Sequence, residues 1–501
     1  MTRKPAFGLI ATLLAGACTV GPDYHAPKIA VPPAYQEAQP APGAGIDPAR
    51  WWQAFGDPEL DALVTRALAD NPDIAVAASR VRQARLQEIA AGAEGLPTVN
   101  ASGNVTHVHF SKNAGLSSLA RQFGGGSGNG EGSGSGGGIA LPGDGITTYA
   151  LGFDASWELD LFGGARRGRE AAAARVDAAV WNRRDAAVTL AAEVADAYFA
   201  LRLDQEQVRV IEQELAHQRR ALEIAGHAAK VGLVPAIDVT RQRGGVTATE
   251  ARLEPLRADI RVRMHALGIL TGQAPEALTD ELAAAPDALA AAPVVPAGLP
   301  SDLLRRRPDV RAAERQLAAA TADIGVAVAD LYPKFSLTGV AQLISSSLAS
   351  LVESDSIQAT GSGAVSFPLL DWGKRKANVG MRREDREQAY QTYRATVLQA
   401  LRDVEDPLAR IAAERTRGAA LRRALDDKQA AARATEARYR TGFVAQDAVL
   451  DAQTDVLSTR EQIAASDAQL RQDTASLFKA LGGGWSANDD PAAPEAAGGA
   501  R

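Results

Sequence analysis

The chain has 501 residues, a formal net charge of −6 and a single cysteine. This length suggests two or three ordinary domains, and the near balance of charge gives no basic excess that would favour nucleic acid as a partner. One cysteine excludes an intramolecular disulfide and a metal–thiolate site. Beyond the N-terminal stretch, no apolar run approaches the roughly 20 residues of a transmembrane helix, so any later membrane crossing is expected to be a β-barrel.

The N-terminus has the parts of an export signal. Arg3 and Lys4 precede an apolar run over residues 5–14, and small residues then lead to Cys18. The run is too short to span a bilayer, so residues 1–17 are predicted to be a cleaved signal peptide. A small-residue stretch that ends in cysteine resembles the lipobox of bacterial lipoproteins, although Ala15 stands where that motif usually has leucine. The resemblance implies a covalent lipid on Cys18; an incidental thiol is the alternative.

Four segments alternate between apolar and polar residues, namely 97–110, 149–161, 331–343 and 357–369. This period of two predicts β-strands with an apolar outer face and a small or polar inner face, as in outer-membrane strands. A soluble, half-buried antiparallel sheet is the alternative. Four strands cannot close a barrel, which needs about eight. Either the sheet packs on helices, or several chains pool their strands.

A glycine-rich tract, residues 124–138, separates the first two predicted strands. Its composition predicts a flexible loop. It contains a chance G-x-G-x-x-G, which joins two strands rather than a strand and a helix and therefore does not indicate a dinucleotide site.

The chain contains an internal repeat. "NPD" at 71–73 matches "RPD" at 307–309 with an offset of 309 − 73 = 236, and "DLFG" at 160–163 matches "LDWG" at 370–373 with an offset of 373 − 163 = 210. The second offset also pairs Gly232 with Gly442. Each half is predicted to contain a short helix, a strand, a loop, a strand, a long helix, a turn and a medium helix. The change of offset places extra residues between the strands of the first half.

The longest predicted helix covers residues 164–230, which contain no proline. Its apolar residues recur at spacings of 4 and 3, which indicates coiled-coil packing in a rod of roughly 100 Å. The counterpart is 374–440, in which Pro407 predicts a kink. Shorter partner helices are predicted at 74–94 and 237–271, so that each half forms an antiparallel pair of rods.

Seven motifs together carry a resemblance to a known family: "CTVGPDY" from Cys18 on, 51–74, "SWELDLFGGARRG", "FPLLDWGKR", "RYRTG", "VLDAQ" and "LFKALGGGW". They resemble the TolC-like outer-membrane efflux ducts, and within them the lipidated exit proteins of RND-type pumps. The resemblance implies a mainly α protein with a membrane β-barrel: a homotrimer with four strands per chain in a twelve-stranded barrel, lipid-anchored in the outer membrane, and a helical tube in the periplasm. It implies a periplasmic adaptor and an inner-membrane RND transporter as partners.

These inferences divide the chain into segments. They are the signal peptide 1–17, a lipidated N-terminal segment with the first equatorial elements 18–70, repeat one 71–272, an equatorial linker 273–300, repeat two 301–484 and a flexible tail 485–501.

The turns at 231–236 and 441–446 are the expected tips of the two helix pairs. The resemblance implies that the adaptor docks there, on Val231, Gly232, Leu233, Thr441, Gly442 and Phe443. Plain helix-to-helix turns are the alternative reading.

The resemblance also implies a periplasmic gate beside these tips. Asp238, Tyr439 and Asp451 match its residues, whereas Ala448 and Val444 stand where the family has an aspartate and an arginine. Asp447 is the candidate to replace the missing carboxylate. Solvated carboxylates at helix ends are the alternative.

No catalytic motif occurs in the chain, and neither a cofactor nor a metal is expected. His107 and His109 share a predicted strand face, but solvated histidines are favoured over a metal site. The expected function is a passive exit duct for drugs or other small solutes. The alternatives are an exit duct for a secreted polypeptide (type I secretion) and a lipoprotein enzyme, which lacks any catalytic constellation.

Overall fold

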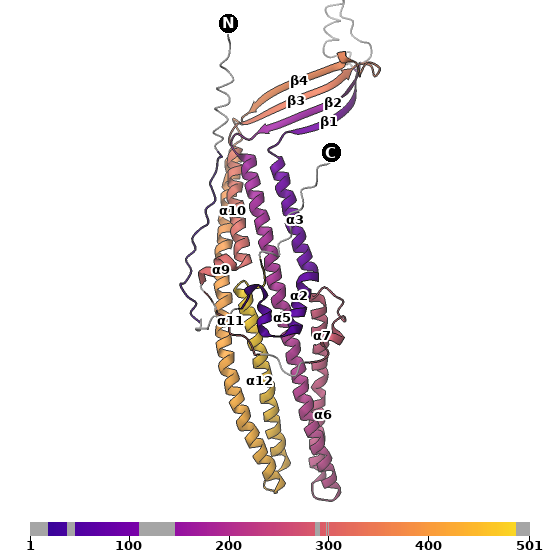
Figure 1. Cartoon of the computed structure of the whole chain (residues 1–501), viewed down its shortest axis with the longest axis vertical. Coiled ribbons are helices and arrows are strands. Elements are labelled where there is room, and N and C mark those ends of the chain that lie inside the picture. The colour runs from indigo at the N-terminus through magenta and orange to yellow at the C-terminus, as the bar shows by residue number, and fades with distance from the viewer. Residues whose placement is uncertain are drawn as a thin grey trace, which may run out of the picture. The chain divides into compact units, whose positions relative to one another are not determined.

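A computed structural model describes residues 19–37, 46–109, 146–285, 291–296, 298 and 300–486 (Figure 1). They form two compact units. Unit 1 contains residues up to 24, 88–171 and 321–384, and unit 2 contains 25–87, 172–320 and the residues from 385 on. The signal peptide, Cys18, the glycine-rich loop 124–138 and residues 487–501 of the tail lie outside the described residues.

Helices dominate the described chain, and one four-stranded sheet accompanies them. The helices are η2 (Pro48–Phe55), α2 (Pro58–Asp70), α3 (Pro72–Ala93), α5 (Gly164–Lys230), α6 (Ala236–Ala251), α7 (Leu253–Leu270), α8 (Thr279–Leu282), α9 (Pro300–Arg306), α10 (Pro308–Ala329), η3 (Ser354–Ser356), α11 (Lys374–Arg440) and α12 (Gln446–Ala480). The strands are β1 (Thr98–Val108), β2 (Ile146–Leu159), β3 (Lys334–Ser345) and β4 (Ile357–Ser366). The described helices include none whose length and apolarity suit a bilayer crossing.

The repeated "NPD" and "RPD" motifs are helix starts. Pro72 and Pro308 are the first residues of α3 and α10, where a missing amide hydrogen costs nothing. In the first half Asn71 also caps α3, because its side-chain oxygen accepts from the amide of Asp73 at 2.8 Å.

The four predicted strands are confirmed. They pair antiparallel in the order β1-β2-β3-β4. Odd-numbered apolar residues face one another across the sheet, for example Leu151 opposite Leu343. Polar side chains form rungs at even positions: Asn100 donates to Asp154 at 3.0 Å, and Gln342 donates to Gln358 at 2.9 Å. The alternation therefore continues over the whole sheet, with one apolar and one polar face.

The internal repeat holds at the level of single residues. The pair Thr98–Ser156 of β1 and β2 becomes Lys334–Ser366 when the offsets 236 and 210 are added, and this is the observed pair of β3 and β4. The last glycine of the "DLFG" motif, Gly163, has a φ of 80°, and the last glycine of the "LDWG" motif, Gly373, has a φ of 85°.

Both predicted long helices are confirmed at 67 residues each, and α11 remains one helix although Pro407 lies inside it. The helix predicted over 237–271 is interrupted at a single residue: α6 ends at Ala251 and α7 begins at Leu253, while Arg252 between them has right-handed helical angles, φ −75° and ψ −20°. Pro255 explains the break: it has no amide hydrogen for the carbonyl of Ala251, and its ring crowds that carbonyl. Its counterpart α12 contains no proline and is an unbroken helix of 35 residues.

Unit 2 is held by an aromatic core built from the "WWQAF" motif. Trp51 stacks on Phe478 with ring centroids 5.2 Å apart, and Phe55 meets Phe199 at 4.9 Å. Farther along α5, Ile211 and Leu215 pack with Val246 and Leu253 in a smaller core. These contacts confirm that the apolar stripe of α5 is a packing seam.

In unit 1 the residues that follow Cys18 are tightly bound to α5. The buried side chain of Arg167 donates to the carbonyl of Val20 at 3.2 Å and forms an ion pair with Asp23 at 2.6 Å. Gly21, with φ of 91°, approaches so closely that a Cβ atom on it would lie 2.5 Å from the Cα atom of Gly325. Only glycine fits this position. Arg167, Gly21 and Gly325 together form a clamp that fixes the "GPDY" motif within unit 1.

Candidate functional site

The two long helices end in the same backbone motif, at tips that lie side by side at one end of unit 2 (Figure 1). In α5 the amide of Gly232 donates to Ala229 at 3.1 Å and the amide of Leu233 donates to Ala228 at 2.9 Å. The same two bonds recur 210 residues later at the end of α11. Both glycines are left-handed, with φ of 80° at Gly232 and 79° at Gly442, as this type of helix end requires.

Large apolar side chains at these tips point into solvent. Val231, Leu233 and Phe443 are 70, 78 and 77% exposed. Thr441 is exposed too, and its hydroxyl donates back to the last turn of α11. All six residues predicted for docking therefore lie at the surface of the two tips.

The four predicted gate residues are not joined to one another by hydrogen bonds or ion pairs within the described part of the chain. Asp238 lies in the first turn of α6 and pairs with Arg241 at 3.5 Å. On α12, Asp447 accepts from the amide of Ala448 at 2.8 Å, and Asp451 is exposed. No hydrogen bond joins these three carboxylates to one another in the described part of the chain.

Two glutamines that the sequence did not single out connect the tips instead. The hydroxyl of Tyr439, at the end of α11, donates to Oε1 of Gln446 at 3.4 Å. Nε2 of Gln446 donates in turn to Oε1 of Gln242, which is buried on α6. This amide link joins the α5–α6 hairpin to the α11–α12 hairpin. A glutamine on a helix has no distinctive spacing, so the sequence carries no signal for it.

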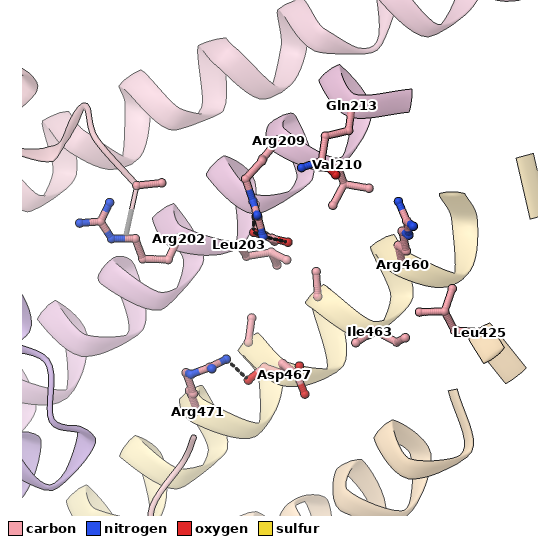
Figure 2. Close-up of a pocket in the computed structure, with 14 residues that line it drawn as sticks. Arg202, Leu203, Arg209, Val210, Gln213, Leu425, Arg460, Ile463, Asp467 and Arg471 are labelled. Atoms are coloured by element: carbon pink, nitrogen blue, oxygen red, sulfur yellow. Dashed lines mark hydrogen bonds and ion pairs between the residues drawn. The ribbon is translucent and has the colours of Figure 1, made fainter. Parts of the chain in front are cut away.

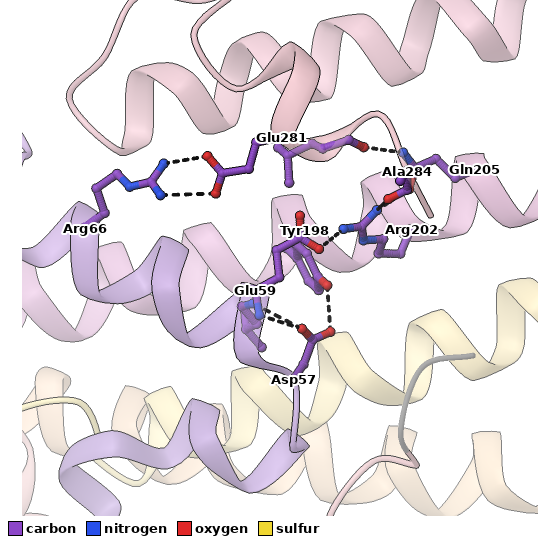
Figure 3. A network of polar contacts seen from close by, with 10 residues as sticks. Asp57, Glu59, Arg66, Tyr198, Arg202, Gln205, Glu281 and Ala284 are labelled. Carbon is purple, nitrogen blue, oxygen red and sulfur yellow. Dashed lines mark hydrogen bonds and ion pairs between the residues drawn. The ribbon is translucent and has the colours of Figure 1, made fainter. Parts of the chain in front are cut away.

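A polar network ties the segment before α3 to α5 (Figure 3). Asp57 caps α2 by accepting from the amides of Glu59 and Leu60, and it accepts from the hydroxyl of Tyr198 at 2.6 Å. Burial, and then the hydrogen bond to Asp57, raises the pKa of Tyr198 far above its ordinary value. This tyrosine therefore stays a neutral donor.

Arg202 is the buried cation of the same network. It forms an ion pair with Glu59 and donates to Gln205 at 2.6 Å and to the carbonyl of Ala284 at 3.0 Å. Burial raises the pKa of Glu59, and the Arg202 charge opposes that shift. The network thus fixes two segments from different parts of the sequence onto one turn of α5.

A cavity of about 460 Å³ lies between α5 and α12 (Figure 2). Four arginines line it, against two carboxylates: Arg202, Arg209, Arg460, Arg471, Glu206 and Asp467. Burial and the nearby Arg422 lower the pKa of Arg471. The cavity is cationic, and its lining contains no nucleophile–base pair.

The described residues contain no group of three His, Cys, Asp or Glu side chains that could hold a metal ion. His107 lies on β1, where its ring nitrogen contacts the hydroxyl of Thr147 at 2.9 Å.

The sequence matches one protein-family model. The model describes outer membrane efflux proteins and matches residues 63–273 and 299–483, which together are most of the chain.

Curated relatives align over nearly their whole length. The pyoverdine export outer membrane protein OpmQ of Pseudomonas putida is 31% identical over 465 residues, which cover 92% of this chain and 93% of the relative. The antibiotic efflux pump outer membrane protein ArpC of the same species is 29% identical over 495 residues, which cover 97% and 96% of the two chains.

Solved structures of outer-membrane channels resemble this chain in fold. The outer-membrane channel OprN superimposes with a TM-score of 0.82 at 31% identity and covers 93% of this chain and 100% of its own. The open state of the outer-membrane channel MtrE of Neisseria gonorrhoeae gives a TM-score of 0.77 at 26% identity, with coverage of 93% and 98%.

Proposed function

The chain belongs to the outer membrane efflux protein family, and from this premise we propose that it is the passive exit duct of a tripartite pump for drugs or other small solutes. It is an outer-membrane efflux channel with a periplasmic helical part, a transporter rather than an enzyme. An inner-membrane RND transporter would supply the energy, and a periplasmic adaptor would connect the two. The names of the relatives concern pyoverdine, antibiotics and toluene, which favours small cargo over a secreted polypeptide.

We propose that the working duct is a homotrimer whose chains each give four strands to a twelve-stranded barrel. The main support is the sheet itself, because β1 and β4 have no strand partner on their outer edges within the described residues. Four strands are also about half the number that a closed barrel needs. Three copies would remove every edge.

We propose that Cys18 carries a covalent lipid. The clamp formed by Arg167, Gly21 and Gly325 supports this, because it fixes the residues directly after Cys18 within unit 1, the unit that contains the sheet. Labelling with radioactive palmitate should be lost in Cys18→Ser. Trimer should still form, because a single acyl chain contributes only marginal membrane affinity. Label that persists in Cys18→Ser would refute the lipid assignment.

We propose that the two tips dock the adaptor, through Val231, Gly232 and Leu233 on one and Thr441, Gly442 and Phe443 on the other. Support comes from the exposure of the apolar side chains of Val231, Leu233 and Phe443. The helix-end motif holds these side chains in a fixed direction, so they are presented to a partner at low entropic cost.

We propose that the gate consists of Asp238, Tyr439, Asp447 and Asp451 together with the amide link of Gln446 and Gln242. Tyr439 belongs to both sets, since its hydroxyl starts the link between the hairpins. In a trimer the carboxylates would form rings around the axis. The link would keep the two hairpins of each chain together while the duct is closed.

The exit-duct function and the docking tips are tested by measuring drug export in a strain that lacks the gene and carries a plasmid copy of the wild type or a variant. Wild type should restore resistance and lower the accumulation of a fluorescent drug, whereas Gly232→Glu or Gly442→Glu should restore neither, because each adds bulk and charge at a docking tip. Gly244→Glu is the matched control: Gly244 lies inside α6, and a Cβ atom added to it would meet nothing within 4 Å. Tip variants that pump like wild type at equal trimer levels would show that the tips do not dock the adaptor.

A further inference from the structure

The cavity between α5 and α12 has the size of a small-molecule site. Its volume of about 460 Å³ lies within the roughly 300–1,000 Å³ that is typical of ligand pockets. The lining runs over about three turns of each helix, from Arg202 to Gln213 on α5 and from Arg460 to Arg471 on α12. Figure 2 shows these two stretches facing each other across the cavity. Since α5 and α12 belong to different hairpins, a molecule in the cavity would touch both.

The lining has an excess of positive charge, because it contains four arginines and two carboxylates. Both carboxylates are already paired: Glu206 with Arg209 at 2.6 Å, and Asp467 with Arg422, which lies outside the lining, at 2.5 Å. The guanidinium of Arg202 is paired as well, with a carboxylate of α2. The excess charge therefore lies at the two ends of the α12 stretch, where the other two arginines stand.

Arg460 carries one of these charges. No hydrogen bond or ion pair joins its side chain to another residue in the described part of the chain. Burial raises the pKa of Glu214 on α5, and the charges around it, Arg460 among them, oppose that rise. The residue 210 positions before Arg460 is Glu250, which pairs with Arg219 across the first hairpin at 2.7 Å, whereas adding 210 to Arg219 gives the uncharged Gln429. Packing of the second hairpin therefore does not explain the arginine at 460.

Arg471 carries the other charge. One of its N–H groups donates to the backbone carbonyl of Asp467 at 2.9 Å. Burial lowers the pKa of Arg471 more than the charge of Asp467 raises it. The surroundings thus disfavour the charged guanidinium, and an anion that entered the cavity would stabilise it.

Apolar side chains line the cavity between these two charges. Arg460 and Arg471 are separated by about 16 Å along the axis of α12 and lie on nearly the same side of that helix. The apolar residues of the lining include Leu203, Val210, Leu425, Ile463, Ala464 and Ala468. The cavity therefore offers a positive charge near each end and an apolar middle.

We propose that the cavity binds an elongated organic dianion, whose two acidic groups contact Arg460 and Arg471 and whose apolar body lies between α5 and α12. A small inorganic anion would leave the apolar lining in water, and a neutral apolar molecule would contribute nothing to the two guanidinium groups. A dianion of matching length satisfies both parts of the lining and bridges the two hairpins of one chain. The site lies within a single chain, roughly 28 Å along α5 from the tip at Gly232, so it depends neither on the proposed trimer nor on the adaptor.

Calorimetric titration of the purified protein in lipid nanodiscs tests this site, with decanedioate as the ligand and empty nanodiscs as the blank. Wild type should bind decanedioate saturably, and the ligand should raise the thermal midpoint because it binds the folded state. Arg460→Gln and Arg471→Gln should each weaken binding at least tenfold. Ala464→Phe should abolish binding, because it fills the cavity while both arginines remain. Arg433→Gln removes an exposed arginine of α11 outside the lining, and this matched control should bind like wild type.

Two further ligands separate the effect of charge from that of shape. The diamine and the diol of the same chain length as decanedioate should both bind at least tenfold more weakly. Equal binding of the three ligands, or arginine variants that bind like wild type, would overturn the assignment of a dianion. An Ala464→Phe variant that binds like wild type would place the ligand elsewhere and overturn the cavity assignment. A wild type that shows neither saturable binding nor a midpoint shift at millimolar decanedioate would overturn the site itself.

Discussion

At the scale of single residues, Gly232 and Gly244 make a matched pair of glycines in opposite backbone conformations. Gly232→Ala should weaken its helix end by about 1 kcal/mol, because φ is 80° even though a Cβ atom placed there would meet nothing within 4 Å. Gly244→Ala lies in the interior of α6 and should stabilise that helix by roughly 0.5–1 kcal/mol. Amide hydrogen exchange across residues 228–248 should thus change in opposite directions. Equal effects of the two substitutions would contradict the positive φ.

Asp473 offers a prediction about pH. It is buried on α12 with Oδ2 lacking any partner among the described residues, and burial raises its pKa. Because the folded pKa lies above the unfolded one, the folded state binds more protons between the two values, and stability falls as pH rises through that window. Asp473→Asn should therefore raise the thermal midpoint at pH 7 and change it little near pH 3.

Asp427→Asn is the control for this measurement, because Asp427 is exposed on α11. Asp427→Asn should leave the difference between the thermal midpoints at pH 7 and near pH 3 the same as in wild type. If Asp473→Asn and wild type have the same thermal midpoint at pH 7, the cost of burying the charged carboxylate is offset by contacts in the assembled protein.

At the scale of elements, the break between α6 and α7 depends on one residue. Pro255→Ala restores an amide hydrogen for the carbonyl of Ala251, and removal of a proline from a helix interior is worth up to about 3 kcal/mol. The amides around Arg252 should exchange at least tenfold more slowly, and the two helices should become one. Unchanged exchange there would mean that packing, not the proline, sets the break.

Helices and strands whose apolar residues recur at a regular spacing were predictable from the sequence. Features that depend on how distant segments pack were not. The four strands follow from the alternation of apolar and polar residues, and α5 follows from its heptad spacing and lack of proline. The second 67-residue helix, α11, follows from the internal repeat although Pro407 lies inside it. The rule by which Pro407 predicts a kink also predicts the interruption near Pro255. The Gln446–Gln242 link depends on how two hairpins pack, and no spacing along the chain reports that.

At the scale of the whole molecule, the gate carboxylates should determine ion preference. Three copies would place Asp238 and Asp451 in rings around one axis, and such rings favour cations. Asp238→Asn/Asp451→Asn should therefore lower the cation preference in planar-bilayer recordings. Asp70→Asn, which changes an exposed carboxylate at the end of α2, is the control and should leave the preference unchanged. Selectivity that survives the double substitution would make Asp447 the next candidate.

The Gln446–Gln242 link between the hairpins and the Arg241–Asp238 ion pair beside it respond differently to dissolved salt. Both side-chain amides of the link are uncharged, so dissolved ions do not screen their attraction as they screen an ion pair. Arg241 and Asp238, in contrast, attract each other less as ionic strength rises. A rise in ionic strength would therefore weaken the Arg241–Asp238 ion pair and leave the amide contact between the two hairpins in place.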